Sequence, residues 1–307
     1  MNYYLGFDGG GTKTDCAVMD AAGQIVGKST AGPSNPLRVG NEAAFAALGS
    51  AAEKALAAAK LDKSSISAVC AALAGAGRPG VADGVRKFLA SAFPGAIAHV
   101  ASDFEAALEA AAGAGAGVVL IAGTGSAAFG RDAEGNMARA GGYGPWIGDE
   151  GSAFDIGRRA VAAAARERDR GETSQFAEAL LSAARCKNWD ELIERVATHA
   201  DDIFPRIFPA VAAAAESGDA VARDLILGAA DSLAELADAV ITRLKLRDQE
   251  FVLAKSGGVF GHSDILEQRL DARLVMIAPR AKIGPLRVSP AAGAAQLARR
   301  LAEPARP

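Results

Sequence analysis

Two glycine-rich turns carry the residues best suited to bind phosphate. The first is Asp8-Gly9-Gly10-Gly11-Thr12-Lys13-Thr14. Consecutive glycines, including Gly10 and Gly11, let the backbone turn tightly and direct its N–H groups at an anion. The hydroxyls of Thr12 and Thr14 and the charge of Lys13 add further donors. The run predicts a phosphate-binding hairpin, and a structural turn without a ligand is the alternative.

This first turn differs from a Walker A loop. Thr12 stands where that motif has glycine, and the residues after Lys13 predict a strand where the motif requires a helix. Asp8 ends the apolar run in front of the turn. A carboxylate beside bound phosphate is suited to hold Mg²⁺, directly or through water, so Asp8 is the candidate metal ligand.

The second turn is Gly123-Thr124-Gly125-Ser126, which follows the apolar run Val118–Ala122. With Ala128 it also spells the Gly-x-Gly-x-x-Ala pattern of dinucleotide-binding folds. That pattern requires a helix next, whereas residues 127–131 predict a strand, so a nicotinamide enzyme is disfavoured. Two phosphate-binding turns in duplicated domains facing one cleft would hold one polyphosphate between them.

Three carboxylates and one amide are candidates for contact with a second substrate. Asp103 follows a predicted strand and opens a predicted helix, so it is either the helix N-cap or a base that accepts the proton of an attacking hydroxyl. Asp149 and Glu150 follow a glycine-rich loop that includes Gly142 and Gly144. Adjacent carboxylates suit sugar hydroxyls, with a helix cap at Asp149 as the alternative. Asn35 lies between two prolines and is either a turn residue or a ligand contact.

Positioning these residues requires strands that alternate with helices, which predicts an α/β layer structure. The predicted strands are Leu5–Phe7, Asp15–Met19, Gln24–Ser29, Ile66–Leu73, Ala96–Ala101, Val118–Ala122, Ala127–Arg131 and Glu250–Ala254. The predicted helices are Asn41–Lys60, Val81–Phe93, Phe104–Ala112, Asp149–Arg168, Ser174–Ala184, Trp189–Ala197, Asp219–Leu244 and Pro290–Leu301.

The first three strands and the turns between them recur 112 residues later. That shift places Gly11-Thr12 on Gly123-Thr124 and Asp20-Ala21 on Asp132-Ala133. A duplicated three-stranded meander, one copy per domain, explains the match better than chance does, because the turns agree in type as well as in letter.

Composition excludes several other classes of protein. The 307 residues carry 33 basic and 36 acidic side chains, a net charge of −3 with no basic stripe, which argues against a nucleic-acid partner. The three cysteines are too few and too widely spaced for a disulfide framework or a zinc site. The uncharged run from Ala110 to Gly130 is interrupted by glycines, so it predicts a loop and a buried strand, with no membrane span. The first residues lack a secretory signal, so a cytoplasmic protein is expected.

Taken in order, these motifs resemble the N-acetylglucosamine kinase group of the BadF/BadG/BcrA/BcrD ATPase family, within the sugar kinase, Hsp70 and actin superfamily. The two glycine turns match its phosphate motifs, and residues 141–152 match its substrate loop, which more often has Trp at the position of Tyr143. Ser256–Val259 and Pro290–Ala294 match its adenosine segments. The resemblance covers nearly the whole chain.

The resemblance implies two ribonuclease-H-like (actin-like ATPase) domains with an interdomain cleft. The N-terminal domain would span 1–115 with 290–307, and the C-terminal domain 116–289 with a helical insertion. It further implies ATP and Mg²⁺ as cofactors, a small-molecule sugar substrate and a homodimer. Asp103 would be the general base for the sugar 6-hydroxyl, and Asp8 would organise Mg²⁺. The nucleotide would contact Gly10, Gly11, Thr12, Lys13, Thr14, Gly123, Thr124, Gly125, Ser126, Gly257, Gly258 and Gly293. The sugar would contact Asn35, Asp103, Gly142, Gly144, Asp149 and Glu150.

Other functions within the same superfamily remain as alternatives. Dehydratase activators need cysteines that bind an iron–sulfur cluster at a subunit interface, and Cys16, Cys70 and Cys186 fit this poorly. Kinases of the repressor, ORF and kinase group carry a zinc-binding cysteine cluster that is missing from the sequence. A nucleotide-dependent sensor without catalysis is a third possibility. N-acetylglucosamine is the first choice of substrate and glucosamine the second.

Overall fold

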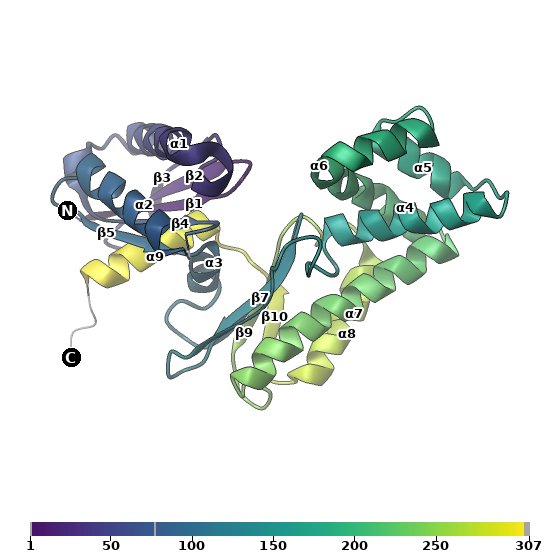
Figure 1. Cartoon of the computed structure of the whole chain (residues 1–307). Helices are drawn as coiled ribbons and strands as arrows, with labels where there is room; N and C mark the ends of the chain where they lie inside the picture. The colour runs from purple at the N-terminus through teal and green to yellow at the C-terminus, as the bar shows by residue number, and fades with distance from the viewer. Residues whose placement is uncertain (1, 77, 304–307) are drawn as a thin grey trace. The chain divides into compact units, whose positions relative to one another are not determined.

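The computed structural model describes residues 2–76 and 78–303. The chain divides into two compact units, each built on a five-stranded sheet with helices (Figure 1). The first unit contains the described residues up to Ala114 and those from Leu286 onward, and the second contains Gly115–Pro285. The predicted α/β class is therefore confirmed in both units.

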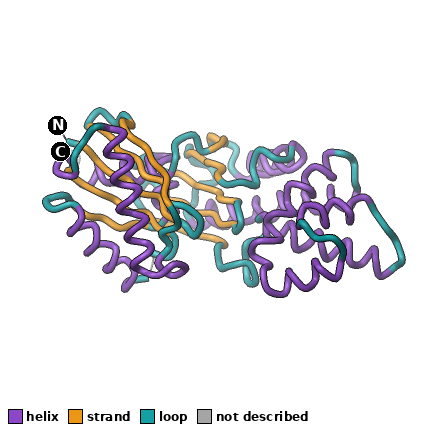
Figure 2. Tube along the Cα trace, turned by 90° about the horizontal axis from the view of Figure 1, so that it is seen from above, coloured by secondary structure: helices purple, strands orange, loops and turns teal. Residues whose placement is uncertain are grey.

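The sheet of the first unit has the strand order β3-β2-β1-β4-β5, and Figure 2 shows its strands side by side. These strands are β1 (Tyr3–Gly9), β2 (Thr14–Asp20), β3 (Ile25–Ala31), β4 (Ile66–Leu73) and β5 (Ile97–Ala101). The first three form an antiparallel meander, whereas β4 runs parallel to β1 and β5 parallel to β4. The carboxyl ends of β1, β4 and β5 therefore meet at one edge of the sheet.

Helices cover both faces of this sheet. They are α1 (Pro36–Ala59), α2 (Pro79–Ala92), α3 (Asp103–Ala112) and α9 (Pro290–Ala302), with a short 3-10 turn, η1 (Lys63–Ser65). Leu5 and Phe7 point to the face covered by α1 and α2, and Tyr4 and Cys70 to the face where α9 packs. Figure 1 shows α9, in yellow, beside α3 in this unit, although it follows every element of the second unit in the chain.

Gly6 of β1 allows α9 to approach the sheet closely. A Cβ placed on Gly6 would lie 2.1 Å from the backbone nitrogen of Ala295 and 2.3 Å from the carbonyl oxygen of Ala291. We expect Gly6→Ala to lower the free energy of unfolding by about 1–3 kcal/mol or more, because a backbone clash cannot be relieved by a rotamer change. Chemical denaturation measures this.

The matched control is Gly49→Ala. Gly49 lies within α1, and its Cβ would have no heavy atom within 4 Å. Replacing a helical glycine with alanine there should raise stability by about 0.5–1 kcal/mol. If both substitutions shifted stability in the same direction, the close packing of β1 on α9 would not be the cause.

The second unit repeats the topology of the first, with the strand order β10-β9-β6-β7-β8. Its strands are β6 (Gly117–Ala122), β7 (Ser126–Arg131), β8 (Met137–Gly141), β9 (Val252–Ser256) and β10 (Lys282–Pro285). Strands β6, β7 and β8 form an antiparallel meander, and β9 and β10 are parallel to β6. Both β7 and β8 start 112 residues after β2 and β3, so the duplicated meander predicted from sequence is present.

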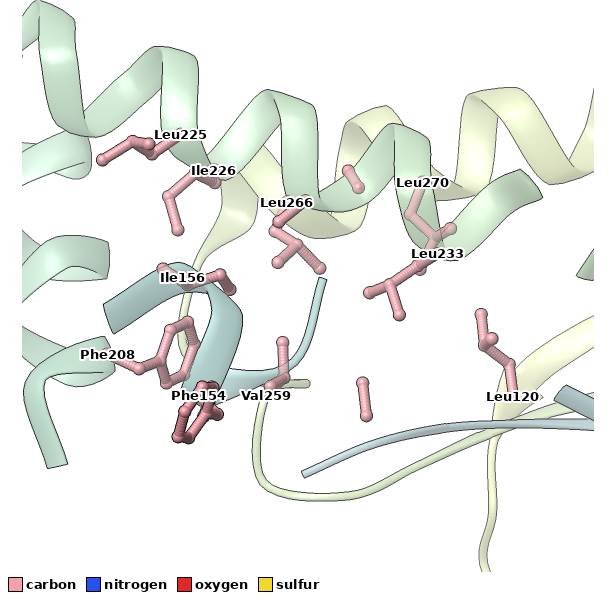
Figure 3. Packing of buried hydrophobic residues seen from close by; sticks show 14 of the residues in the cluster. Leu120, Phe154, Ile156, Phe208, Leu225, Ile226, Leu233, Val259, Leu266 and Leu270 are labelled. Atoms are coloured by element: carbon pink, nitrogen blue, oxygen red, sulfur yellow. The ribbon is translucent and has the colours of Figure 1, made fainter. Parts of the chain in front are cut away.

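Five helices complete the second unit. They are α4 (Ala153–Asp169), α5 (Gln175–Ala184), α6 (Trp189–Glu216), α7 (Ala220–Arg243) and α8 (Asp264–Ile277). Figure 3 shows how Phe154 of α4, Phe208 of α6, Leu233 of α7 and Leu266 of α8 pack in one core with Leu120 of β6. This core fixes the start of α4, which carries part of the site described below.

Several predicted boundaries were wrong. Helix α1 starts at Pro36, with Asn35 as its N-cap, and not at the predicted Asn41. Gly40 (φ +79°) kinks this helix without ending it. Helix α6 continues past Ala197 to Glu216, through a kink at His199 and across Pro205 and Pro209. Helix α8 and strand β10 were not predicted. The run Ala110–Gly130 contains the end of α3 as well as β6 and β7. Within residues 2–76 and 78–303, no helix combines the length and apolar character needed to cross a membrane.

Candidate active site

Asp8 and Asp103 lie at the same edge of the first sheet. Asp8 of β1 pairs with Ala72 of β4, which pairs with Ala101 of β5, two residues before Asp103. The pKa of Asp8 is raised to about 6, mainly by burial and then by the neighbouring charges of Asp103 and Asp15. The structure thus brings together the two carboxylates that the sequence assigned to catalysis and metal binding.

The N-cap of α3 is Ser102, so the reading of Asp103 as the cap was wrong. The Ser102 side chain accepts a hydrogen bond from the backbone N–H of Glu105, whose carboxylate accepts one from the Ser102 N–H at 2.8 Å. This capping box satisfies the first turn of the helix. Asp103 is the first helical residue, and the capping box is formed by Ser102 and Glu105.

The first glycine turn, residues 10–13, joins β1 to β2. The Gly10 N–H donates to the Lys13 carbonyl at 3.0 Å, and the Gly10 carbonyl accepts from the N–H groups of Ser34 and Asn35 at 3.1 Å each. Thr12 is exposed. The Lys13 ammonium donates to the Asp15 carboxylate at 2.6 Å, and that hydrogen bond raises the pKa of Lys13. The cation predicted to face phosphate is therefore already neutralised within the hairpin.

A second cation, Arg38, lies over this turn and was missed in the sequence. A Cβ on Gly11 would lie 2.7 Å from Arg38 Nη1 and 2.9 Å from its Cδ. Among the residues that the structure describes, no carboxylate forms an ion pair with Arg38. The sequence offered one signal for Arg38, which is its position one helical turn after Asn35. The Asn35 N–H bonds the Gly10 carbonyl, so the start of α1 lies against the glycine turn. The prediction placed the helix start five residues too late to show this.

The second glycine turn, residues 123–125, is closed by Asp149. A Cβ on Gly125 would lie 2.7 Å from a carboxylate oxygen of Asp149. Burial raises the pKa of Asp149, while hydrogen bonds from the backbone N–H groups of Ser126 and Gly144 oppose that rise. Asp149 has φ +70°, a strained backbone conformation that is concentrated at functional sites. The helix cap predicted for Asp149 is provided by Ser152.

Gly257 and Gly258 lie beside the same turn. A Cβ on Gly257 would lie 2.2 Å from the Ala122 carbonyl, so only glycine fits there, and its φ of +114° also requires glycine. The Val259 N–H donates to the Ala122 carbonyl at 3.0 Å. A Cβ on Gly123 would lie 4.0 Å from the Gly258 nitrogen. The second glycine turn and the segment predicted to contact adenosine, more than 130 residues apart in the chain, are thus in contact.

The hydroxyl of Thr14, predicted as a phosphate donor, and that of Ser126, predicted as a nucleotide contact, are both bonded to backbone carbonyls. Thr14 is fully buried, and its hydroxyl donates to the Gly32 carbonyl at 2.7 Å. Ser126 is 3% exposed, and its hydroxyl donates to the Glu150 carbonyl at 2.7 Å. A hydroxyl has one proton to donate, so neither side chain has a donor left for phosphate.

The remaining predicted sugar contacts lie on two loops, one in each unit. The Asn35 side-chain oxygen caps α1 by accepting from the Leu37 N–H at 3.0 Å, which leaves its amide group for a ligand. Glu150 is exposed next to Asp149. Gly142 and Gly144 both have positive φ and flank Tyr143, which is 65% exposed. The backbone of this loop therefore requires the glycines that the sequence pattern singled out.

Gly293 does not face an opening. It lies inside α9, where a Cβ would meet the Ala106 carbonyl of α3 at 2.1 Å. It is buried, and its missing side chain is explained by close packing of two helices. We therefore assign Gly293 a packing role and remove it from the nucleotide contacts.

The repeated five-stranded unit with a glycine hairpin in each copy defines a two-unit α/β protein of the actin-like ATPase class, built from ribonuclease-H-like folds. A ROK family glucokinase from Streptomyces griseus shares this fold with a TM-score of 0.62 and 17% identity, covering 97% of this chain and 99% of that one. The chain belongs to the BadF/BadG/BcrA/BcrD ATPase family, which it matches over residues 5–298. The family inferred from the motifs is confirmed.

Individual relatives are similar over nearly their whole length. The chain is 31% identical to the N-acetylmuramic acid/N-acetylglucosamine kinase of Clostridium acetobutylicum, covering 97% of this chain and 99% of that protein. It is 28% identical to the N-acetyl-D-glucosamine kinase of Dictyostelium discoideum, with 96% and 97% covered. A candidate N-acetylglucosamine kinase from Chromobacterium violaceum has a TM-score of 0.78 and 26% identity, with 96% and 98% covered.

Proposed function

We propose that this protein is an ATP-dependent kinase that phosphorylates the 6-hydroxyl of an amino sugar, with N-acetylglucosamine as the first candidate and glucosamine as the second. The observation that carries the proposal is the pair Asp8 and Asp103 at one sheet edge, next to a glycine hairpin. The names of the two curated relatives support the choice of substrate.

In the proposed reaction, Asp103 accepts the proton of the sugar hydroxyl as its oxygen attacks the terminal phosphorus of ATP. A bond forms between that oxygen and phosphorus, the bond to the bridging oxygen breaks, and ADP leaves. Phosphoryl transfer depends mainly on positioning and charge compensation, so the groups that hold the triphosphate contribute most of the acceleration. A general base adds about 10²–10⁴-fold.

The phosphate contacts in this proposal are backbone groups of the two hairpins, at Gly10, Gly11, Thr12, Gly123, Thr124 and Gly125. The Arg38 side chain lies over Gly11 and supplies the positive charge for the phosphate. Lys13 does not supply it, because its ammonium is paired with Asp15. Gly257 and Gly258 contact the nucleoside. Asn35, Asp149 and Glu150 contact the sugar, and Gly142 and Gly144 shape the loop before the last two.

Asp8 fits the role of a Mg²⁺ ligand. Its carboxylate is largely desolvated beside two other acidic groups, and a cation there would relieve the repulsion that raises its pKa. Mg²⁺ in kinases is commonly held by one or two carboxylates together with phosphate oxygens. Bound Mg²⁺ would neutralise phosphate charge. Asp8 would hold it, and Asp103 would remain the proton acceptor.

The iron–sulfur alternative is disfavoured by the cysteines. Cys16, Cys70 and Cys186 are buried, the first two in the core of the first unit. Burial raises the pKa of both Cys16 and Cys70, which opposes the thiolate form that ligates iron. The homodimer and the cytoplasmic location implied by the resemblance belong to the same proposal, and light scattering of the purified chain measures the first.

An ADP-release assay against a panel of hexoses and amino sugars tests the function. We expect Mg²⁺-dependent release of ADP with N-acetylglucosamine or glucosamine, lost on addition of EDTA and restored by excess Mg²⁺. Phosphorylation at the 6-position is verified by mass spectrometry and NMR of the product. ATP turnover that is independent of every sugar would instead support a nucleotide-dependent sensor or ATPase.

A further inference from the structure

In the second unit, a buried hydroxyl ties the glycine hairpin to the loop that carries the proposed sugar ligands. Ser126 is the first residue of β7, immediately after the turn. Its hydroxyl donates to the Glu150 carbonyl at 2.7 Å, and its own carbonyl accepts from the Gly142 N–H at 2.8 Å. The Ser126 N–H binds the Asp149 carboxylate. One residue therefore contacts both ends of the segment 142–150.

The first unit makes the corresponding contact through Thr14. Thr14 is the first residue of β2, and its hydroxyl donates to the Gly32 carbonyl and lies 2.7 Å from the Ser34 hydroxyl. Ser34 is fully buried, and a Cβ on Gly9 would lie 2.1 Å from its Oγ. The next residue is Asn35, whose N–H is bound to the Gly10 carbonyl. The loop with the proposed sugar contact is thus fixed to the hairpin here as well.

The two contacts occupy the same place in the duplicated topology. Thr14 and Ser126 lie 112 residues apart, the spacing of the repeated meander. Each donates to a carbonyl just ahead of the N-cap of the helix that follows the third strand, which is Asn35 for α1 and Ser152 for α4. The intervening loops differ in length, yet the hydroxyl-to-carbonyl bond is present in both units. Because this hydrogen bond recurs in both units, it belongs to the duplicated fold and is not a feature of one loop alone.

We propose that Thr14 and Ser126 are positioning residues that hold each phosphate hairpin and the sugar loop behind it as one rigid piece. The proposal rests on the proposed kinase function and deepens it. It assigns these two hydroxyls a positioning role, in contrast to the neighbouring residues that bind phosphate. It predicts that removing a hydroxyl from a phosphate motif impairs binding of the sugar. Removal of a phosphate ligand would impair binding of ATP instead.

The test uses four variants of the full chain. Ser126→Ala and Thr14→Val remove the hydroxyl, whereas Ser126→Thr and Thr14→Ser exchange the two residue types that already occupy this position in the two units. The Kd of N-acetylglucosamine, or of the best sugar from the panel, is measured by calorimetry without nucleotide. We expect it to rise roughly five- to ten-fold in Ser126→Ala and Thr14→Val, the cost of one buried hydrogen bond, and to stay within about two-fold in the exchanges.

Ser29→Ala is the matched control. The Ser29 hydroxyl also donates to a backbone carbonyl, that of Ala51 in α1 at 2.5 Å, at a position away from the hairpin. We expect its sugar Kd to match that of the unmodified chain. An unchanged sugar Kd in Ser126→Ala with a raised KM for ATP would overturn the proposal. So would equal weakening in Ser126→Ala and Ser126→Thr.

Hydrogen exchange of the ligand-free chain keeps this test separate from the proposed function. We expect Ser126→Ala to speed amide exchange in residues 142–154, which include Gly142 and Ala153, the latter bound to the Gly123 carbonyl at 2.9 Å. Unchanged exchange there would refute the positioning role whether or not the chain binds a sugar. If the unmodified chain bound no sugar while exchange responded as expected, the kinase assignment would fail and the rigid connection would stand.

Discussion

Asp103→Asn is expected to lower turnover by about 10²–10⁴-fold while the affinities for ATP and sugar stay nearly unchanged. The amide keeps the size of the side chain and can still contact a hydroxyl, but it cannot accept a proton. Because the N-cap of α3 is Ser102, the substitution leaves the capping box intact, and the helix should keep its position. The change therefore isolates proton transfer from folding and from binding.

Steady-state kinetics together with calorimetry of each substrate measure this prediction. Asp83→Asn, in α2 of the same unit, is the control for the loss of one carboxylate, because Asp83 is exposed and forms an i,i+3 ion pair with Arg86 on the helix surface. Its turnover should equal that of the unmodified chain. An Asp103→Asn variant with unaltered turnover would remove Asp103 from the mechanism and leave positioning by the hairpins as the source of the rate.

The buried strands could be predicted closely from sequence. The range Ile66–Leu73 of β4 agrees at both ends, because a parallel strand buried on both faces is a nearly continuous apolar run, here with Ser67 as its one polar residue. The hairpins were recognisable because glycine is required where the chain turns between two such runs. Buried apolar runs and obligatory glycines are local signals, so a single sequence shows them.

The arrangement around the hairpins could not be predicted in the same way. Helix α8 buries only Leu266, Leu270 and Leu274, a narrow stripe among charged residues that becomes meaningful once the core of the second unit is present. Ser126 was predicted to contact the nucleotide, whereas its hydroxyl bonds the Glu150 carbonyl, 24 residues away in the chain. Whether a hydroxyl donates to a distant backbone carbonyl depends on the tertiary structure. The residue type alone does not reveal it.

Arg38→Met is expected to raise the KM for ATP by about 10–100-fold, the cost of losing a charge-assisted hydrogen bond to phosphate. The guanidinium lies over Gly11 of the first hairpin, and no carboxylate among the described residues neutralises it. Methionine retains a long unbranched side chain, so packing on the turn changes little. Arg38→Lys should recover only part of the loss, because an ammonium lacks the planar fork of donors.

Lys13→Met is the matched control, since Lys13 belongs to the glycine motif itself. Its ammonium is bound to Asp15, which also accepts from the Thr30 hydroxyl at 2.6 Å, so its removal should change the KM for ATP by no more than a few-fold. Initial rates at varied ATP and saturating sugar compare the two. A larger effect from Lys13 than from Arg38 would return the phosphate charge to the motif lysine, and its ion pair with Asp15 would then have to break when nucleotide binds.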